Sequence, residues 1–541
     1  MTAVTLGLAS IDDTKRQLAA AFQGQPQGER IDFASEPVNL LAVLAEAEKI
    51  WRVEATRDGY TGHGDVLWDW GEMSVEAGSG LFEGLAAQAV PGRSGSGRPR
   101  LRRAERSQIE LRVLSLDDLV PADHRVRLVW AFADGLDLGP LYARIKAVEG
   151  RPGHPPADPR VLVALWLHGT IEGVGSAREL ARLCEEHLAF QWLCGGVSVN
   201  HKSLGDFRVA HGEVLERLLI DGFAALLKAR VAHLDRVAQD GVRVRAAAGA
   251  ASFRRASTLK ECQRAAEDRV RQLRAEVDGD PAASSRRRVA AQRRAAEDRQ
   301  RRVGEALTAA EQLQAARERA KRGAGKSDKP PEPPTGERHD EAGGIALEKE
   351  AAPAKEPRAS TTDAQARVMK MPDGGWRPAY NAQFATDTQS GLIAGVSVDN
   401  VGSDMGKMRP MSDQLTRDYG IRPAEHLVDG GFAKLSDVAT LAEAGVTVYA
   451  PVPEPRDKRR ERHAPLPDDP PGVAGWRLRM GSPAAKEIYK QRAATAECTN
   501  AQARNRGLRR FLVRGSKKVK AVLLWFALAH NMACTWRLAR A

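Results

Sequence analysis

Cysteine is scarce in this chain of 541 residues, and its five copies are scattered along the sequence. Cys184, Cys194, Cys262, Cys498 and Cys534 include no C-x-x-C pair. An odd number of isolated cysteines argues against a disulfide framework and against a structural zinc site. We therefore expect reduced, partly buried thiols, as in a cytosolic protein.

Long apolar runs are also lacking, which argues against a membrane protein. The longest run near the C-terminus covers residues 521–529, whereas a membrane-spanning helix needs about 20 apolar residues. The first residues show no basic stretch followed by an apolar block, the pattern of a secretory signal. Aromatic residues make up 5% of the chain and charged residues 28%, which favours long solvated segments between packed domains.

Charge is unevenly distributed along the chain. Residues 1–92 hold six Lys or Arg against fourteen Asp or Glu, a net charge of −8. The whole chain carries +12, so residues 93–541 carry +20. A strongly basic body indicates a polyanionic partner, and the weak membrane signal favours nucleic acid. We interpret residues 1–92 as an acidic N-terminal extension of unknown role and residues 93–110, which are rich in arginine and glycine, as a basic linker.

Residues 111–230 show helical periodicity with clear capping signals. Ser115 lies three residues before Asp118, Asp158 precedes a proline and an apolar run, and Ser176 opens another run. Short helices separated by glycine-containing turns predict a helix-turn-helix-like DNA-binding domain, although a plain helical bundle fits almost as well. In the first case a recognition helix begins near four candidate DNA-binding residues: Asn200, His201, Lys202 and Arg208.

Residues 231–541 predict a second region that contains strands. Leu234–Arg245 alternates apolar and polar residues, as a half-buried strand does. Residues 259–321 are dominated by Arg, Ala, Glu and Gln with sparse Leu and Val, which predicts an insertion of two charged helices in a hairpin. Residues 322–360, rich in Pro, Lys, Glu and Gly, predict a disordered linker.

Beyond residue 360 strands and helices alternate. Ala379–Thr386 and Leu392–Val398 predict a β-hairpin. A helix follows, then a strand that ends in the sequence His-Leu-Val-Asp-Gly-Gly-Phe, then a helix, a strand and a helical C-terminal part. This order predicts an α/β fold of the ribonuclease-H type, with a mixed sheet and flanking helices. An all-helical domain precedes the sheet, and the helical hairpin is inserted between the first strand of the sheet and the strands that follow.

Two strands carry an acid directly before glycine, at Asp240-Gly241 and at Asp429-Gly430. Asp is depleted in strands, and a carboxylate beside bare backbone suits a metal ion or a phosphate. Asp-Gly-Gly is equally an ordinary turn sequence, so both interpretations stay open for the second pair. We expect the glycines to clear space for metal and phosphate. If the two strands are neighbours, Asp240 and Asp429 meet at one edge of the sheet.

A third carboxylate from the late helix would complete an oxygen cage for a divalent metal ion. Glu487 and Glu497 are the candidates, and they lie ten residues, nearly three turns, apart. We favour Glu497 because its neighbours Ala496 and Cys498 are small and allow the helix to pack close to the sheet. Further aspartates remain as rivals: Asp363, Asp387, Asp399 and Asp404.

Three segments carry a resemblance to a known family: "STTDAQARVMKMPDGGWRPAYNAQF", "LVDGGFA" and "YKQRAATAECTNAQARNRG". They resemble the DDE transposases of bacterial insertion sequences, over roughly residues 111–540. In such families the third acid often lies in a Tyr-x-x-Arg-x-x-x-Glu-x(6)-Lys pattern. Tyr489 and Arg492 fit, but Ala496 stands where the pattern has Glu. The acid comes one residue later at Glu497, and the basic residue seven positions beyond it is Arg504.

The resemblance implies a catalytic site formed by Asp240, Asp429 and Glu497. Two Mg²⁺ ions, or Mn²⁺, about 3.5–4 Å apart would be held by these acids. Tyr489, Arg492 and Arg504 would contact the scissile DNA. The enzyme would cut transposon ends and join their 3′-hydroxyls to target DNA.

The resemblance also implies partners and a location for the enzyme. Its helical domain would bind terminal inverted repeats in double-stranded DNA, and its hairpin would hold flanking DNA. We expect at least a homodimer, in the cytoplasm with the nucleoid and without membrane contact. Two alternatives stay open: an inactive protein that only binds transposon ends, and a ribonuclease-H-like nuclease without strand transfer.

Overall fold

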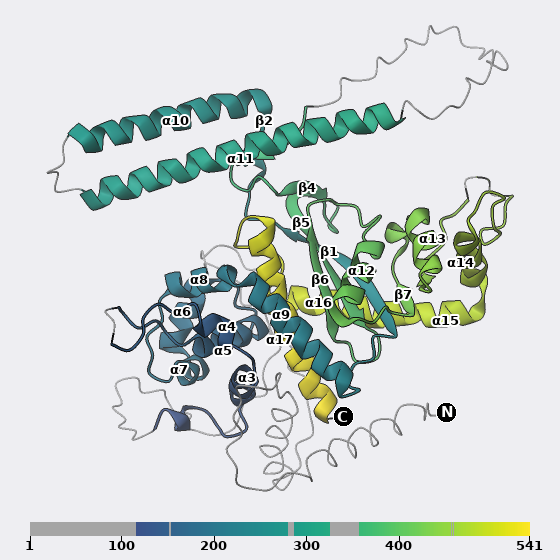
Figure 1. Cartoon of the computed structure of the whole chain (residues 1–541), viewed down its shortest axis with the longest axis horizontal. Helices are drawn as coiled ribbons and strands as arrows, with labels where there is room; N and C mark the ends of the chain where they lie inside the picture. The colour runs from purple at the N-terminus through teal and green to yellow at the C-terminus, as the bar shows by residue number, and fades with distance from the viewer. Residues whose placement is uncertain are drawn as a thin grey trace, which may run out of the picture.

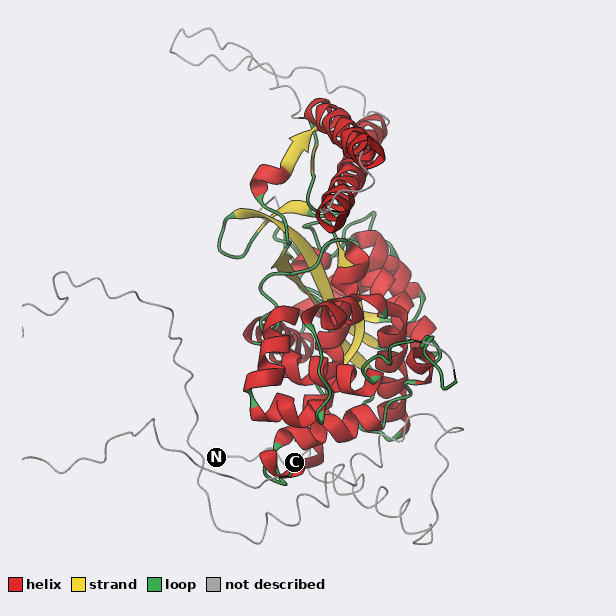
Figure 2. Ribbon diagram, turned by 90° about the vertical axis from the view of Figure 1, so that its left-hand side faces the viewer, coloured by secondary structure: helices red, strands yellow, loops and turns green. Residues whose placement is uncertain are grey.

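The computed structural model describes residues 115–540 apart from 151–152, 280–285, 325–355, 456 and 458. The predicted acidic extension and basic linker, residues 1–110, lie outside the described residues. A helical region is followed by a mixed sheet with helices on both faces, and a long helical hairpin stands off from this body (Figures 1 and 2). The α/β class, with a preceding helical region, is as predicted.

The helical region is built from short elements: η1 (Asp117–Leu119), α3 (Arg125–Asp134), α4 (Gly139–Tyr142), α5 (Pro159–Ile171), α6 (Ala177–Glu186), α7 (Leu188–Cys194), α8 (His201–Ala210) and α9 (Gly212–Lys228). The predicted caps are confirmed. Ser115 and Asp118 exchange hydrogen bonds of 3.1 and 3.3 Å around η1. Asp158 accepts a backbone hydrogen bond at the start of α5, and Ser176 does so at the start of α6.

The sheet has the strand order β6-β5-β1-β7-β8, and a short strand, β4, also pairs with β5. The strands are β1 (Arg236–Arg245), β4 (Arg367–Lys370), β5 (Trp376–Asp387), β6 (Ile393–Asp399), β7 (Glu425–Leu427) and β8 (Thr447–Tyr449). β1 pairs antiparallel with β5 and parallel with β7. β5 and β6 form the predicted antiparallel hairpin. The strands that carry the two acid-glycine pairs are therefore neighbours.

Helices cover both faces of the sheet, and β1 alternates between them. Asp240 lies opposite Phe384, whose ring packs against Phe526 of α17 (Ser516–Arg540) with 5.4 Å between centroids. Gln239 points to the other face, where its amide donates to the carbonyl of Lys407 at the start of α12 (Met408–Tyr419). The remaining elements are η3 (Gly430–Phe432), α13 (Leu435–Glu443), α14 (Pro471–Gly481), α15 (Pro483–Arg492), η4 (Ala493–Glu497) and α16 (Cys498–Asn505).

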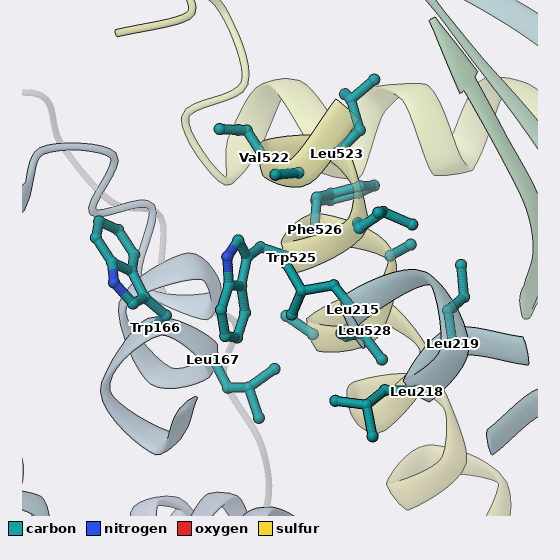
Figure 3. Close-up of a cluster of buried hydrophobic side chains, with 14 of the residues drawn as sticks. Trp166, Leu167, Leu215, Leu218, Leu219, Val522, Leu523, Trp525, Phe526 and Leu528 are labelled. Carbon is teal, nitrogen blue, oxygen red and sulfur yellow. The ribbon is translucent and has the colours of Figure 1, made fainter. Parts of the chain in front are cut away.

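The C-terminal helix α17 is buried between the helical region and the sheet (Figures 1 and 3). On one side the indole of Trp525 donates to the carbonyl of Arg208 at 3.0 Å. On the other, the Asn531 amide exchanges two 2.8 Å hydrogen bonds with the backbone of Ile393 in β6. A helix that is apolar all round belongs in a core. One continuous hydrophobic cluster accordingly joins the helical region, α17 and the sheet.

The charged insertion forms two helices, α10 (Ala256–Gly279) and α11 (Arg286–Ala324), which pack side by side (Figure 1). At their base η2 (Ala250–Ser252) leads into β2 (Phe253–Arg255), which pairs with β3 (Arg358–Ser360). The predicted disordered linker is wrong at both ends. Residues 322–324 continue α11, and residues 358–360 pair with β2 because the chain returns beside the strand from which it left. Residues 325–355 lie outside the described residues.

A membrane-spanning helix is absent from the described part of the chain. None of its helices combines the length and the apolar character needed to cross a lipid bilayer.

Because one core joins both regions, we expect Phe526→Ala to destabilise them together. Loss of this buried ring should lower the free energy of unfolding by about 3–5 kcal/mol. Urea unfolding, followed by circular dichroism and by tryptophan fluorescence, should show one shared transition. Leu478→Ala on α14 is the matched control, since Leu478 is 61% exposed and should change stability by about 0.5 kcal/mol or less. Two separate transitions in the wild type would contradict the shared core.

Candidate active site

Asp240 and Asp429 are brought together by the parallel pairing of β1 and β7. In that register Ala238 lies opposite Leu427, and each acid follows two residues beyond this pair. Side chains alternate along a strand, so the acids leave the sheet on the same side as the paired residues. Asp429 also begins η3, where its carboxylate accepts the backbone N–H of Gly431 at 2.8 Å.

Glu497 closes η4, a single π-helical turn between α15 and α16. A π turn holds one residue more than an α-helical turn, so residues five apart come to lie above one another. Arg492 and Glu497 are five apart, and the guanidinium Nη1 donates to the carboxylate at 2.8 Å. The π turn therefore absorbs the one-residue displacement of this acid from the family pattern.

Arg492 lies between all three acids. Its Nη2 is 3.3 Å from Oδ2 of Asp240 and 4.0 Å from Oδ2 of Asp429, while Nη1 contacts Glu497. The exposed fraction of the side chain rises from 15% for Asp240 to 40% for Asp429 and 59% for Glu497. The group is therefore buried at Asp240 and opens to solvent at Glu497.

The electrostatics of the group follow from burial and from charge crowding. Burial raises the pKa of Asp240; Arg492 lowers it, and the negative charge of Asp429 raises it again, leaving it above the ordinary value. Burial lowers the pKa of Arg492, but Asp240, Tyr489 and Asp429 together raise it above its usual range. Three carboxylates share one guanidinium, and this excess of negative charge favours a cation.

Asn500 is a member of the group that the sequence did not reveal. Its side-chain amide donates to Oδ2 of Asp240 at 3.0 Å, and the residue is buried. It lies on α16 three residues after Glu497, one helical turn further on. The spacing of three residues from Glu497 is the one sequence signal for Asn500. It is a weak signal, because Asn is common on polar helices. Asn500 and Arg492 thus hold the same carboxylate oxygen from opposite ends of η4.

The glycines beside the aspartates have different roles. A Cβ on Gly241 would overlap with Oδ1 of Asp404 and with the amide of Gln383 on the α12 face of the sheet. The expectation that Gly241 clears space for metal and phosphate is therefore wrong, because this position faces away from Asp240. At Gly431 the nearest atom to an added Cβ is Oδ1 of Asp429, at 3.0 Å. This glycine allows the carboxylate to fold back on its own turn.

The rival acids have other partners. Asp363 accepts from the hydroxyl of Tyr380 at 2.7 Å, and Asp387 holds the turn of the β5–β6 hairpin through Ser390. Asp399 pairs with Lys407 at 2.6 Å. The remaining two are Asp404, which accepts from the amides of Asn381 and Gln383 on the α12 face, and Glu487, which is exposed and pairs with Lys490.

The residues predicted to contact DNA fall into two places. Tyr489 is partly buried near Arg492 and the acids, and burial raises its pKa. Arg504 is exposed near the end of α16. At the other place, Asn200 caps α8 by accepting the N–H groups of Lys202 and Ser203, and its neighbours His201 and Lys202 are exposed.

Arg208 does not share the exposed start of α8. Its guanidinium lies 4.5 Å from the centre of the Trp166 ring, and the residue is 9% exposed. This corrects the expectation that Arg208 belongs to the surface of a recognition helix. Arg208 lies four residues, about one turn, after the buried Leu204, on the face of α8 that packs against Trp166.

No three His, Cys, Asp or Glu side chains within the described ranges lie close enough together to hold a metal ion. Asp240, Asp429 and Glu497 each lie within 4.0 Å of the Arg492 guanidinium, which separates their carboxylates. Their chemistry nevertheless suits a hard divalent cation, which prefers carboxylate and amide oxygens. Direct coordination by all three acids requires Arg492 to leave its place between them.

Two family models match parts of the chain. A transposase domain (DUF772) matches residues 114–210, which contain α3 to α8, and a transposase DDE domain matches residues 473–536, which contain Arg492, Glu497 and most of α17. Neither a curated protein nor a solved structure gives a significant match. The two domains identify the chain as a DDE-type transposase.

The class carries general consequences for this chain. A DDE transposase domain implies DNA cleavage and transfer, and a transposase implies DNA binding. Enzymes of the class generally use divalent metal ions. The second match covers the helix that holds Glu497, whereas Asp240 and Asp429 lie outside both matches.

Gly241→Ala should destabilise the protein by about 1–3 kcal/mol, since its Cβ forces apart the amides that hold Asp404. Gly222→Ala is the matched control. Gly222 lies inside α9, where an added Cβ meets nothing within 4 Å, so the substitution should raise stability by up to about 1 kcal/mol. Urea unfolding of both variants measures the difference. Equal effects of the two substitutions would show that the α12 face tolerates a side chain at position 241.

Deleting Ala494 should convert η4 into ordinary α-helix and leave Arg492 beside Glu497, now four residues apart. We expect the free energy of unfolding to change by no more than about 1 kcal/mol. Deleting Ala501 from α16 is the matched control, because it rotates the buried Ala503 out of the core. That deletion should cost about 2–5 kcal/mol. Equal losses for both deletions would mean that the π turn is not an insertion in an otherwise regular helix.

Proposed function

We propose that this transposase cuts the ends of an insertion sequence and joins their 3′-hydroxyls to target DNA, with Asp240, Asp429 and Glu497 as the catalytic acids. The observation that carries the proposal is the meeting of these acids, from three distant segments, around Arg492. In this proposal residues 231–541 form the catalytic domain and residues 111–230 the DNA-binding domain.

The strand order supports a ribonuclease-H-like catalytic domain. Antiparallel strands, β5 and β6, lie on one side of β1, and parallel strands, β7 and β8, lie on the other. In open sheets with parallel strands, ligands bind outside the carboxyl ends of those strands. Asp429 follows β7 at that end, and Asp240 lies on β1 just past their last pair.

Asp240, Asp429 and Glu497 would hold two Mg²⁺ or Mn²⁺ ions. When bound, such ions would activate a water or a 3′-hydroxyl for attack and stabilise the leaving oxygen. The oxygen-only donor set and the excess negative charge of the group support this assignment.

Arg492 has a role of its own in this proposal. A guanidinium binds a phosphate through two parallel hydrogen bonds, as it binds a carboxylate. A DNA phosphate that enters the site would therefore offer Arg492 an equivalent partner and free the acids for metal. Tyr489 would line the same entrance, since the same charges act on it. Arg504 would contact DNA further along.

DNA would be held outside the site by two further elements. The exposed start of α8, with Asn200, His201 and Lys202, would bind the terminal inverted repeats. The hairpin would hold flanking DNA, because residues 286–324 carry twelve Lys or Arg against five Asp or Glu. Pairing of two transposon ends would require at least a dimer.

Replacing Asp240 or Asp429 by Asn, or Glu497 by Gln, should abolish strand cleavage while DNA binding remains. We expect a loss on the order of 10⁴-fold, as for other essential catalytic groups. Nicking of a supercoiled plasmid that carries the transposon ends, with Mg²⁺, measures cleavage, and gel retardation measures binding. Glu487→Gln is the matched control, because Glu487 is 73% exposed on the preceding helix and faces Lys490.

Other outcomes of the same experiment would support the alternatives. Wild-type protein that binds the ends without nicking them would be an inactive end-binding protein. Nicking without joined products would indicate a nuclease that lacks strand transfer. Normal cleavage by the Asp240→Asn variant would contradict the assignment of the site.

A further inference from the structure

A small cavity lies where the helical region meets the segment that follows α16. Its volume is about 30 Å³, enough for about two water molecules or one small oxyanion. Arg208, Arg506 and Arg510 lie in its wall, and no acidic residue appears among the described residues that line it. Val522 and Phe526 of α17 also line the cavity, and both belong to the buried hydrophobic cluster of Figure 3. Three arginines and no acidic residue in the lining favour an anion as the occupant.

Arg208 is the buried member of this group. Its Nη1 donates to the carbonyl of Gly175, and its guanidinium stacks on Trp166. Its Nε has no hydrogen-bond partner among the described residues. Burial lowers the pKa of Arg208 to about 10. A buried guanidinium without a counter-charge is costly, and an anion in the cavity would remove that cost.

Arg506 and Arg510 approach the cavity from the loop after α16. Nη1 of Arg506 is buried and, within the described part of the chain, has no hydrogen-bond partner. Burial lowers the pKa of Arg506 as well. Arg510, which also lines the cavity, is exposed. Two buried N–H groups, those of Arg208 Nε and Arg506 Nη1, lack a hydrogen-bond partner among the described residues, and Arg510 adds an exposed positive charge. An anion that enters from solvent would pair with these groups.

Backbone contact fixes this loop in place. Gly507 has a φ of +81°, and an added Cβ would lie 2.6 Å from the carbonyl oxygen of Gly173. The two backbones therefore touch where a side chain cannot fit, and Arg506 is held beside the Gly173–Gly175 turn. The fold thus sets the position of the backbone from which Arg506 extends.

The chain segment that contains this loop is rich in positive charge. Residues 498–541 contain ten Lys or Arg and no Asp or Glu. Exposed members near the loop include Arg504, Arg509 and Arg510. Exposed cations beside the loop raise the local concentration of a polyanion there.

We propose that this cavity is a phosphate site that binds one phosphate group between Arg208, Arg506 and Arg510. A planar guanidinium group binds two oxygens of a phosphate through paired hydrogen bonds, whereas a spherical halide offers no such pair of acceptors. The phosphate of a DNA backbone and free phosphate share this chemistry. Occupation by DNA rests on the proposed function, whereas affinity for the ion itself does not.

Thermal unfolding of the full chain in phosphate and in chloride, at equal ionic strength, tests the site. Phosphate should raise the midpoint of the wild type by about 2 °C more than chloride does. Arg506→Gln and Arg510→Gln should each lose this difference. Arg509→Gln is the matched control and should keep it, since Arg509 is exposed and outside the lining. A difference that survives in Arg506→Gln and Arg510→Gln would be a general salt effect and would overturn the site.

Gel retardation then separates the two sources of phosphate. If the DNA backbone occupies the site, Arg510→Gln should weaken binding to a transposon-end duplex about tenfold, the loss of one charge-assisted hydrogen bond. Added phosphate should compete with wild-type binding more than sodium chloride does at equal ionic strength. A normal duplex affinity together with a lost phosphate effect would assign the site to free phosphate. The active-site variants above should keep the phosphate effect, so failure of one proposal does not imply failure of the other.

Discussion

Burial of α17 is the constraint on which both regions of the protein depend. This helix contacts α5, α8 and α9 on one side and β6 on the other, so neither region has a complete core without it. Fully burying a large apolar side chain stabilises a fold by about 1.5–3 kcal/mol, and α17 buries such side chains in both directions. α17 therefore fixes where α5, α8 and α9 lie relative to the sheet.

The position of α17 has consequences for both sites. Its N-terminal end follows the loop of Arg506 and Arg510, and that loop follows α16 and Glu497. Packing of α17 thus holds α16 against β1, where the amide of Asn500 donates to Asp240. It also closes the arginine-lined cavity against α8. The two sites carry opposite charge. Carboxylates outnumber the guanidinium around Arg492, whereas the cavity is lined by arginines and by no acidic residue among those described.

Much of the fold could be predicted from local sequence signals, and the candidate site only in outline. Period-two alternation predicted β1, and caps such as Asp158 predicted helix starts, because these signals depend on neighbouring residues alone. The π turn before Glu497 could not be predicted, since its extra residue is accommodated by packing against the sheet. Arg208 and Gly241 were misplaced for a related reason: the sequence does not tell which face of an element will be covered.

The sequence by itself determined the order of elements, the acid-glycine pairs and the basic character of the chain. Composition and periodicity can be read from the sequence because they do not depend on tertiary contacts. Tertiary structure decided which of the many carboxylates share a neighbour. Parallel pairing of β1 with β7 and one widened helical turn bring Asp240, Asp429 and Glu497 to a single guanidinium. Contacts between residues hundreds of positions apart arise from packing, and packing is a property of the whole chain.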